Sequence, residues 1–180
     1  MNTLEAIKAR KSSRSYKECP VEREKLEQLV TAAHNAPSAC PLHLSVVENR
    51  EVLKTLNDAA LAAMKASGNE FLVSRASLEG YQPLYGAPAL LLISAPKGAA
   101  HSEATASCAA ANVTVAAAEL GLGSCYVIAP LLGLGAVPAL SGRIGIPEGY
   151  APVCGVLLGY ADGDAFSVPK GSEEHVNYCR

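Results

Sequence analysis

The 180-residue sequence predicts one domain, residues 1–180, of the α/β or α+β class, with helices around a small sheet. Three buried strand patterns, residues 89–94, 125–128 and 151–160, alternate with helical patterns along the chain. Apolar residues make up 49% of the chain and aromatic residues only 5%, so the core must consist of small and aliphatic side chains. No internal repeat or low-complexity linker divides the chain.

The N-terminal third is predicted to be mostly helical. Asn2 and Glu5 form a capping pair for a short first helix. Apolar residues recur at helical spacing over residues 22–35 and again over residues 51–66, and a short strand is expected at residues 44–48 between them. Residues 67–83 show no clear period and are predicted to be a loop or a short helical cover over a site.

The least charged helix is predicted to begin at Glu103 and to end near Glu119. It is rich in alanine and has no hydrophilic face, so we expect it to be buried on most sides. Gly121 and Gly123 are expected to end it, because glycine adopts the left-handed backbone of a helix terminus cheaply. Residues 130–141 are predicted to be a loop or a broken helix.

No charged residue occurs between Glu119 and Arg143, a length that also suggests a membrane span. Glycines and prolines interrupt this window repeatedly, and a lone helix with so many breaks would leave backbone groups without partners in lipid. The sequence therefore predicts no membrane insertion. The N-terminus has no apolar signal core, so a cytoplasmic location is expected.

Composition argues against several function classes. A net charge of −2 predicts no affinity for nucleic acid or for an anionic membrane. The six cysteines and four histidines show no metal-ligand spacing, so no metal site is predicted. Cys108, Cys125 and Cys154 lie in apolar runs and are expected to be buried, whereas Cys40 and Cys179 could be exposed. No catalytic triad, Walker loop or GxGxxG motif is present, which assigns any chemistry to a bound cofactor.

Five of the fifteen basic residues fall between positions 8 and 17, with no acid among them. Within this stretch Arg10, Lys11, Ser12 and Arg14 offer two guanidiniums, an ammonium and a hydroxyl, a set suited to a phosphate monoester. The alternative is a solvated charged face that follows the first helix. The spacing of the residues favours neither.

Five segments occur in an order that resembles the FMN-dependent nitroreductase family: ARKSSRSY, APSA, GAPALLLI, AELGLGSCY and GIPEGYAPVCGVLLGY. They cover most of the chain, from residue 4 to about 160. The resemblance implies an α+β fold with a central, mostly antiparallel sheet flanked by helices. It also implies a homodimer whose two shared active sites hold FMN, and an extended tail, residues 161–180, that packs on the partner subunit.

The resemblance also implies roles for individual residues. Arg10, Lys11 and Ser12 would bind the phosphate and ribityl chain of FMN. Arg14 would lie near the pyrimidine edge of the flavin, where a cation stabilises the reduced ring. The other implied contacts are Pro37, Ser38 and Ala39 against the ring from the partner subunit, the backbone of Ile128 and Ala129 near flavin N5, and Lys170 near the phosphate.

The chain departs from the family pattern in one loop and in the tail. The family's loop continues with Asn, then one residue, then Gln-Pro-Trp, whereas this chain has Pro41, His43, Leu44 and Ser45 at those positions. Pro41 occupies a flavin-contact position but has no amide side chain, so the usual polar contact is lost or supplied elsewhere. His43 is either a surface histidine or a flavin contact. In the tail, Lys170 is followed by glycine, not by a second basic residue.

The resemblance implies an oxidoreductase in which NADH or NADPH reduces FMN at N5 and the flavin then reduces a nitroaromatic, quinone or similar acceptor. No protein side chain is expected to act as a catalytic group. Two alternatives remain at this level. The altered loop favours a non-catalytic module that binds or stores flavin, and an interaction protein without cofactor would leave the cationic stretch unexplained.

Overall fold

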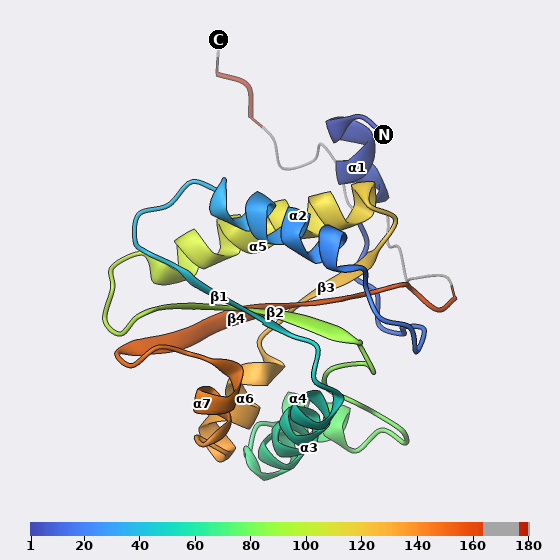
Figure 1. The fold of residues 1–180 in the computed structure, drawn as a ribbon. Coiled ribbons are helices and arrows are strands. Elements are labelled where there is room, and N and C mark those ends of the chain that lie inside the picture. Colours follow the sequence, from blue (N-terminus) through green and yellow to red (C-terminus); the bar gives the residue numbers. More distant parts are fainter. Residues whose placement is uncertain (164–176, 180) are drawn as a thin grey trace.

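Helices lie on both sides of a four-stranded sheet in the computed structural model (Figure 1), which describes residues 1–163 and 177–179. The strand order is β1-β2-β4-β3, and every neighbouring pair is antiparallel. The α+β class and the antiparallel sheet are therefore confirmed. The strands are β1 (His43–Val47), β2 (Ala89–Pro96), β3 (Gly123–Val127) and β4 (Tyr150–Gly159).

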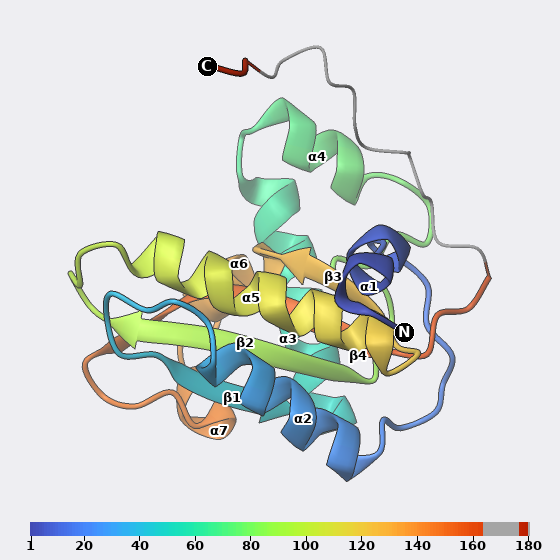
Figure 2. The ribbon, with the colours of Figure 1, turned by 90° about the horizontal axis from the view of Figure 1, so that it is seen from above.

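The helices form a layer on each face of the sheet (Figure 1). The upper layer contains α1 (Thr3–Ala9), α2 (Arg23–His34) and α5 (Ser102–Glu119), and the lower layer contains α3 (Arg50–Ala66), α4 (Glu70–Ala76), α6 (Ala129–Ala136) and α7 (Leu140–Ile144). The helices expected from periodicity are confirmed to within a few residues. Helix α4 lies in the stretch without a clear period, and it projects beyond the β3 edge of the sheet when viewed from above (Figure 2).

Polar side chains at the helix starts explain where several helices begin. The Asn2 side chain accepts a hydrogen bond from the Glu5 amide at 3.0 Å, and the Glu5 carboxylate accepts one from the Asn2 amide at 2.9 Å. The predicted capping pair of α1 is thus confirmed. Asn49 and Asn69 cap α3 and α4 in the same way, each accepting from the amide three residues on.

The sheet separates two hydrophobic cores. The upper core packs α2 and α5 onto the sheet around residues such as Leu29, Val113 and Val156, and the lower core packs α3, α6 and α7 around Leu56 and Leu157. Strand β2 is buried on both faces along nearly its whole length. This position explains why its sequence is a continuous apolar run without alternation.

Helix α5 packs closely on the sheet with one face and leaves another face bare. Ala106, Ala109, Ala110 and Val113 are fully buried against the sheet and α2. The opposite face, here called the bare face, carries four exposed small residues, Ala104, Ser107, Cys108 and Ala111. The expectation that α5 is buried on most sides is therefore wrong for this face, and so is the expected burial of Cys108.

The other two cysteines in apolar runs, Cys125 and Cys154, are buried as expected. The uncharged sequence of α5 is compatible with packing in a core and with a contact surface. It does not show which face of the helix stays exposed in the single chain. Among the described residues, no helix combines the length and the apolar composition that a bilayer crossing requires.

The two glycines after α5 have different roles. Gly121 ends the helix with a φ of +72°, the left-handed conformation that was expected. Gly123 has no such conformation and begins β3 instead, so the expectation is wrong there. A Cβ atom on Gly123 would lie 2.5 Å from Ser13 Oγ. A side chain at position 123 would therefore have to displace Ser13 and would press on the Cβ atom of Ala161, 3.1 Å away.

Helices α3 and α6 are in close backbone contact at Gly133. A Cβ atom at this position would lie 2.6 Å from the Leu56 carbonyl oxygen and 3.2 Å from the Ala60 nitrogen. Both neighbours are backbone atoms of α3, so they cannot move aside without distorting that helix. Gly135, two residues further along α6, has no neighbour within 4 Å of such an atom.

We expect Gly133→Ala to lower the free energy of unfolding by about 1–3 kcal/mol, the usual cost of overpacking a core contact. The matched control, Gly135→Ala, is expected to raise it by about 0.5–1 kcal/mol, because alanine favours a helix over glycine where space is free. Urea denaturation of the two variants measures the difference. Equal stability of both variants would contradict the close contact between α3 and α6.

Candidate functional site

Residues 10–17, here called the cationic segment, run extended from the end of α1 along the start of β3. Ser12 pairs with Ser124 as a parallel bridge, and the Ser13 amide donates a hydrogen bond to the Ser124 carbonyl at 2.8 Å. Further along, Tyr16 pairs with the chain just after β4. The predicted extended conformation is confirmed, and backbone pairing at both ends holds the segment at the edge of the sheet.

Tyr16 fixes the middle of the cationic segment. Its buried hydroxyl donates a hydrogen bond to the Ser13 carbonyl at 3.0 Å. Burial raises the pKa of Tyr16, the nearby Cys125 and Tyr85 raise it further, and Arg14 lowers it. The phenol therefore stays protonated and keeps donating at physiological pH. These influences also show that Arg14 and Tyr85 both lie close to the same phenol.

A hollow of about 210 Å³ lies where the cationic segment meets the C-terminal end of α5. Arg10 and Lys11 line it together with Ala118 and residues 121–124. The space is below the usual size of a whole small-molecule site, which is roughly 300–1,000 Å³. It suits one anionic group of a larger ligand.

The cations of this segment are available to a ligand. In the described part of the chain, no acidic residue forms an ion pair with Arg10, Lys11 or Arg14. The guanidinium of Arg14 makes one long hydrogen bond, 3.4 Å, to the Ser12 carbonyl. Several cations held together without acids create a local positive potential that favours an anion.

Arg14 and Ser12 lie at the level of Cys125 on β3. Burial raises the pKa of the Cys125 thiol, whereas the charge of Arg14 and a hydrogen bond from Ser12 lower it. The thiol is buried, so it contributes packing and not a reactive group. Its neighbours locate the guanidinium of Arg14 beside the middle of the edge strand.

Ile128 and Ala129 follow the last residue of β3 and begin α6. The Ile128 side chain is 61% exposed. It lies four positions after Ser124, which corresponds to about 13 Å along an extended strand. The structure thus places the predicted contacts at residues 10–14 and at residues 128–129 along one edge of the sheet.

The loop at residues 37–41 lies elsewhere in the same chain. Its Ala39 amide donates to Thr105 Oγ1 at 3.2 Å, so the loop contacts the N-terminal end of α5. Thr105 and Ala118, which lines the cationic hollow, are 13 positions apart on α5. That spacing corresponds to about 20 Å. Within one chain, the structure therefore does not bring Pro37, Ser38, Ala39 and Pro41 to the cationic segment.

His43 is half-buried, and its ring makes an edge-on contact with Tyr150, with ring centroids 6.2 Å apart. It is therefore not a freely exposed histidine. Lys170 lies outside the described residues, as does most of the predicted tail.

Sequence reasoning missed three side chains near this edge. Tyr85 packs against the lower core beside Tyr16, Tyr81 contacts Tyr85, and Arg75 of α4 lies over the ring of Tyr81. The only signal in the sequence is the turn-like order Tyr85-Gly86 before β2. No periodic pattern shows that such a turn brings aromatic rings towards the cationic segment.

Comparison with known proteins identifies the class to which this fold and edge site belong. A profile of the Nitroreductase family matches residues 7–160. Crystal structures of two nitroreductases with bound FMN, from Bacteroides fragilis NCTC 9343 and Desulfitobacterium hafniense DCB-2, are each 27% identical to this chain. Their TM-scores are 0.88 and 0.90, and each comparison covers 100% of both chains.

A protein of Methanothermobacter thermautotrophicus with the provisional name NADH dehydrogenase/NAD(P)H nitroreductase is 42% identical over 59 residues. That match covers 31% of this chain and 31% of the relative, so it spans about a third of each. The family profile, in contrast, covers most of the domain. The chain belongs to the nitroreductase family, as its motifs predicted.

Proposed function

We propose that this protein is an FMN-dependent oxidoreductase that passes electrons from NADH or NADPH to a nitroaromatic, a quinone or a similar acceptor. The observation that carries the proposal is the cationic segment, held at the sheet edge with no acidic partner among the described residues. The two similar crystal structures with bound FMN support it. In the part of the chain that the structure describes, no cluster of His, Cys, Asp or Glu offers a metal site.

The residues at this edge fit the chemical groups of FMN. Arg10 and Lys11 would bind the phosphate with the Ser12 hydroxyl, because charge-assisted hydrogen bonds suit a phosphate dianion. Arg14, further along β3, would stabilise negative charge on the ring. The backbone at residues 128–129 would contact the ring near N5. When bound, FMN supplies the redox chemistry, so the protein needs only to position the reactants and tune their charge.

We further propose a homodimer in which each site uses both subunits. The loop at residues 37–41 and the cationic segment lie near opposite ends of α5, about 20 Å apart, so within a single chain the loop does not reach the cations. In a two-fold pair with antiparallel α5 helices, residues 37–41 of the partner subunit would reach the C-terminal end of this α5. The bare face of α5 carries only small uncharged side chains, which allow close helix packing.

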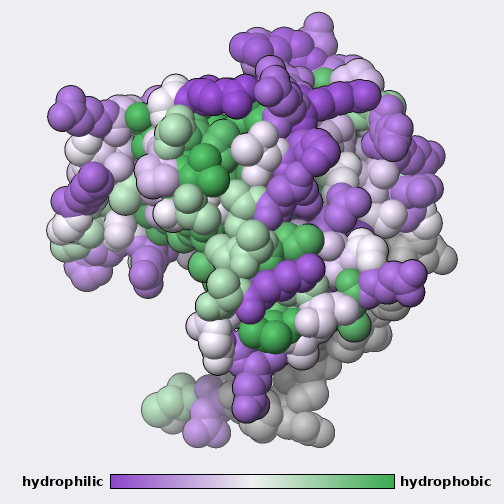
Figure 3. Space-filling view, turned by 90° about the horizontal axis from the view of Figure 1, so that it is seen from below, coloured by the Kyte–Doolittle hydropathy of each residue, from purple (hydrophilic) through white to green (hydrophobic). Residues whose placement is uncertain are grey.

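The exposed apolar side chains support the same assembly. Tyr126 on β3 is 45% exposed, and Ile128 and Phe71 are also exposed. Seen from below, the molecule is indented on one side, and apolar side chains border part of this indentation (Figure 3). Clustered apolar surface of this kind marks an interaction site. The tail, residues 161–180 with Lys170, is proposed to pack on the partner subunit.

That the chain forms a single domain and that the protein is cytoplasmic remain predictions.

A non-catalytic module that binds or stores flavin is the second candidate. The altered loop and the start of β1 favour it, because Pro41 offers no amide to the flavin. Ser45 replaces a bulkier family residue, and its buried hydroxyl has no hydrogen-bond partner within the described residues. Pro41 therefore makes this part of the site less polar than the family pattern implies, and the buried Ser45 hydroxyl is not exposed to a ligand.

Reconstitution separates the two candidates. After incubation with FMN and removal of the excess, we expect the protein to retain flavin absorbance. Anaerobic addition of NADH or NADPH is expected to bleach that absorbance at catalytic rates. A protein that retains no flavin would contradict both candidates. Retained flavin that neither donor bleaches would support the storage module.

Arg10→Ala is expected to weaken FMN binding by about 1.5–3 kcal/mol, or roughly 10- to 150-fold in Kd, because it removes a charge-assisted contact to the phosphate. Quenching of flavin fluorescence during titration measures the affinity. Lys8→Ala is the matched control, since Lys8 is an exposed cation of α1 that does not line the hollow. Equal affinities of the two variants would remove Arg10 from the site.

Ala111→Glu tests the shared site. The substitution places two carboxylates at the proposed α5 contact, so we expect dissociation into monomers and loss of bound flavin. Size-exclusion chromatography with light scattering gives the mass, and absorbance gives the flavin content. Ala62→Glu, on an exposed position of α3, is expected to remain dimeric. A wild-type protein that is monomeric and binds one FMN per chain would contradict the proposed shared site.

A further inference from the structure

We infer that Arg75, Tyr81 and Tyr85 form a subsite for the adenosine-phosphate half of the reduced pyridine dinucleotide, next to the proposed flavin site. The inference rests on the proposed function, because it concerns the electron donor of that site. Beyond the proposed function, it names the residues that would bind the electron donor and the part of the donor that they would contact. Five features support it: the arrangement of the side chains in a row, the strained backbone at Tyr85, their position, the space beside them and the surrounding charge.

The three side chains form a row. The Cζ atom of Arg75 lies 5.4 Å from the centroid of the Tyr81 ring. The rings of Tyr81 and Tyr85 meet edge to face, with centroids 6.1 Å apart and an angle of 84° between their planes. No acid in the described part of the chain forms an ion pair with Arg75. The row therefore presents aromatic surface and an unneutralised guanidinium together.

The backbone at Tyr85 is strained. Its φ is +52°, and only His101 shares a positive φ among the described non-glycine residues. Two tight turns hold this conformation, because the Tyr85 amide donates to Gln82 and the Ala87 amide donates to Leu84, each at 3.0 Å. A bulky residue keeps such a conformation only where its surroundings over-determine it, and strain of this kind clusters at functional sites.

The row starts beside the proposed flavin site and leads away from it. Tyr85 packs against the core that contains Tyr16 and Cys125, the same residues beside which Arg14 lies. Arg75 lies on α4, which projects beyond the β3 edge (Figure 2). A dinucleotide whose nicotinamide reaches the flavin near Arg14 must extend its other half over the adjoining surface. The row occupies that surface.

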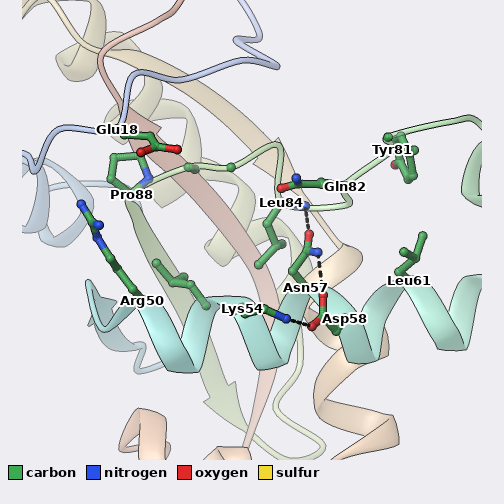
Figure 4. Close-up of a pocket in the computed structure, with 14 residues that line it drawn as sticks. Glu18, Arg50, Lys54, Asn57, Asp58, Leu61, Tyr81, Gln82, Leu84 and Pro88 are labelled. Atoms are coloured by element: carbon green, nitrogen blue, oxygen red, sulfur yellow. Dashed lines mark hydrogen bonds and ion pairs between the residues drawn. The ribbon is translucent and has the colours of Figure 1, made fainter.

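Space for a base lies beside Tyr81. Two hollows, of about 550 and 770 Å³, share Leu61, Gly80 and Tyr81. In Figure 4, Tyr81 and Leu61 lie at one end of the first hollow, away from Arg50 and Glu18. Arg75 lines neither hollow, so the ring surface of Tyr81 that faces them remains free. A purine can stack on such a ring.

The charges around the row favour an anionic ligand over a neutral aromatic acceptor. Lys65 and Glu79 both line the second hollow and offset each other. The charge of Arg75 is therefore in excess, and a planar guanidinium binds phosphate oxygens in pairs. A neutral nitroaromatic would use the tyrosine rings but would leave this charge unpartnered. The adenosine-phosphate half of the donor would contact the tyrosine rings with its base and the Arg75 guanidinium with its phosphate.

Binding of ADP tests the subsite without relying on turnover. We expect isothermal titration calorimetry to detect ADP binding to the FMN-reconstituted protein and to the flavin-free protein. Arg75→Ala and Tyr81→Leu are expected to raise the Kd by about tenfold or more. Tyr81→Phe keeps the ring and should stay within about twofold of wild type. Arg23→Ala removes an exposed arginine of α2 and is the matched control.

A comparison of donors supplies the second readout. Arg75→Ala should lower kcat/KM for NADH by about tenfold and change it by less than about twofold for reduced nicotinamide mononucleotide, which lacks the adenosine half. Wild-type protein that does not bind ADP, or equal losses with both donors, would overturn the subsite. Failure to retain FMN would instead contradict the proposed function, while the ADP titration would still decide on the subsite.

Discussion

The hydrogen bond between the Ser13 amide and the Ser124 carbonyl holds the cationic segment on the sheet, and the site depends on it. Cations gathered without acids repel one another, so their own charges cannot keep the segment in place. Backbone pairing does so instead, with the Tyr16 hydroxyl as a second anchor. Gly123 makes the close approach possible because it has no Cβ atom. Among the described residues, no acid neutralises these charges, which leaves them to a ligand.

Helix α5 links the packing of the fold to the proposed assembly. Small side chains on one face let the sheet and α2 approach the helix closely. The bare face also carries only small, uncharged side chains and is exposed in the single chain. Its length of 18 residues separates the loop at residues 37–41 from the cationic segment. One helix therefore builds the upper core and keeps the loop at residues 37–41 away from the cationic segment. In the proposed dimer, a two-fold partner would cover the bare face and bring these two regions together.

Much of the fold can be predicted from the periodic spacing of apolar residues along the sequence. The spacing of apolar residues predicted α2, α3 and all four strands, and the uncharged alanine-rich run predicted α5. Patterns of this kind do not report which segments meet in space. They therefore predict a helix stop at Gly123, whereas the structure shows that a contact with Ser13 limits the space at this position. The bare position of Cys108 and the positive φ of Tyr85 likewise depend on tertiary contacts, which no local pattern encodes.

Strand β3 lies at the edge of the sheet, and only its start is covered by the cationic segment. Because backbone groups alternate along an antiparallel strand, Tyr126 turns its amide and carbonyl to the same open side as Ser124. Such an edge can template pairing with any extended chain that is nearby. In the proposed dimer, a newly made subunit would therefore be prone to aggregation until this side is occupied. Assembly would then protect the chain against aggregation as well as complete its site.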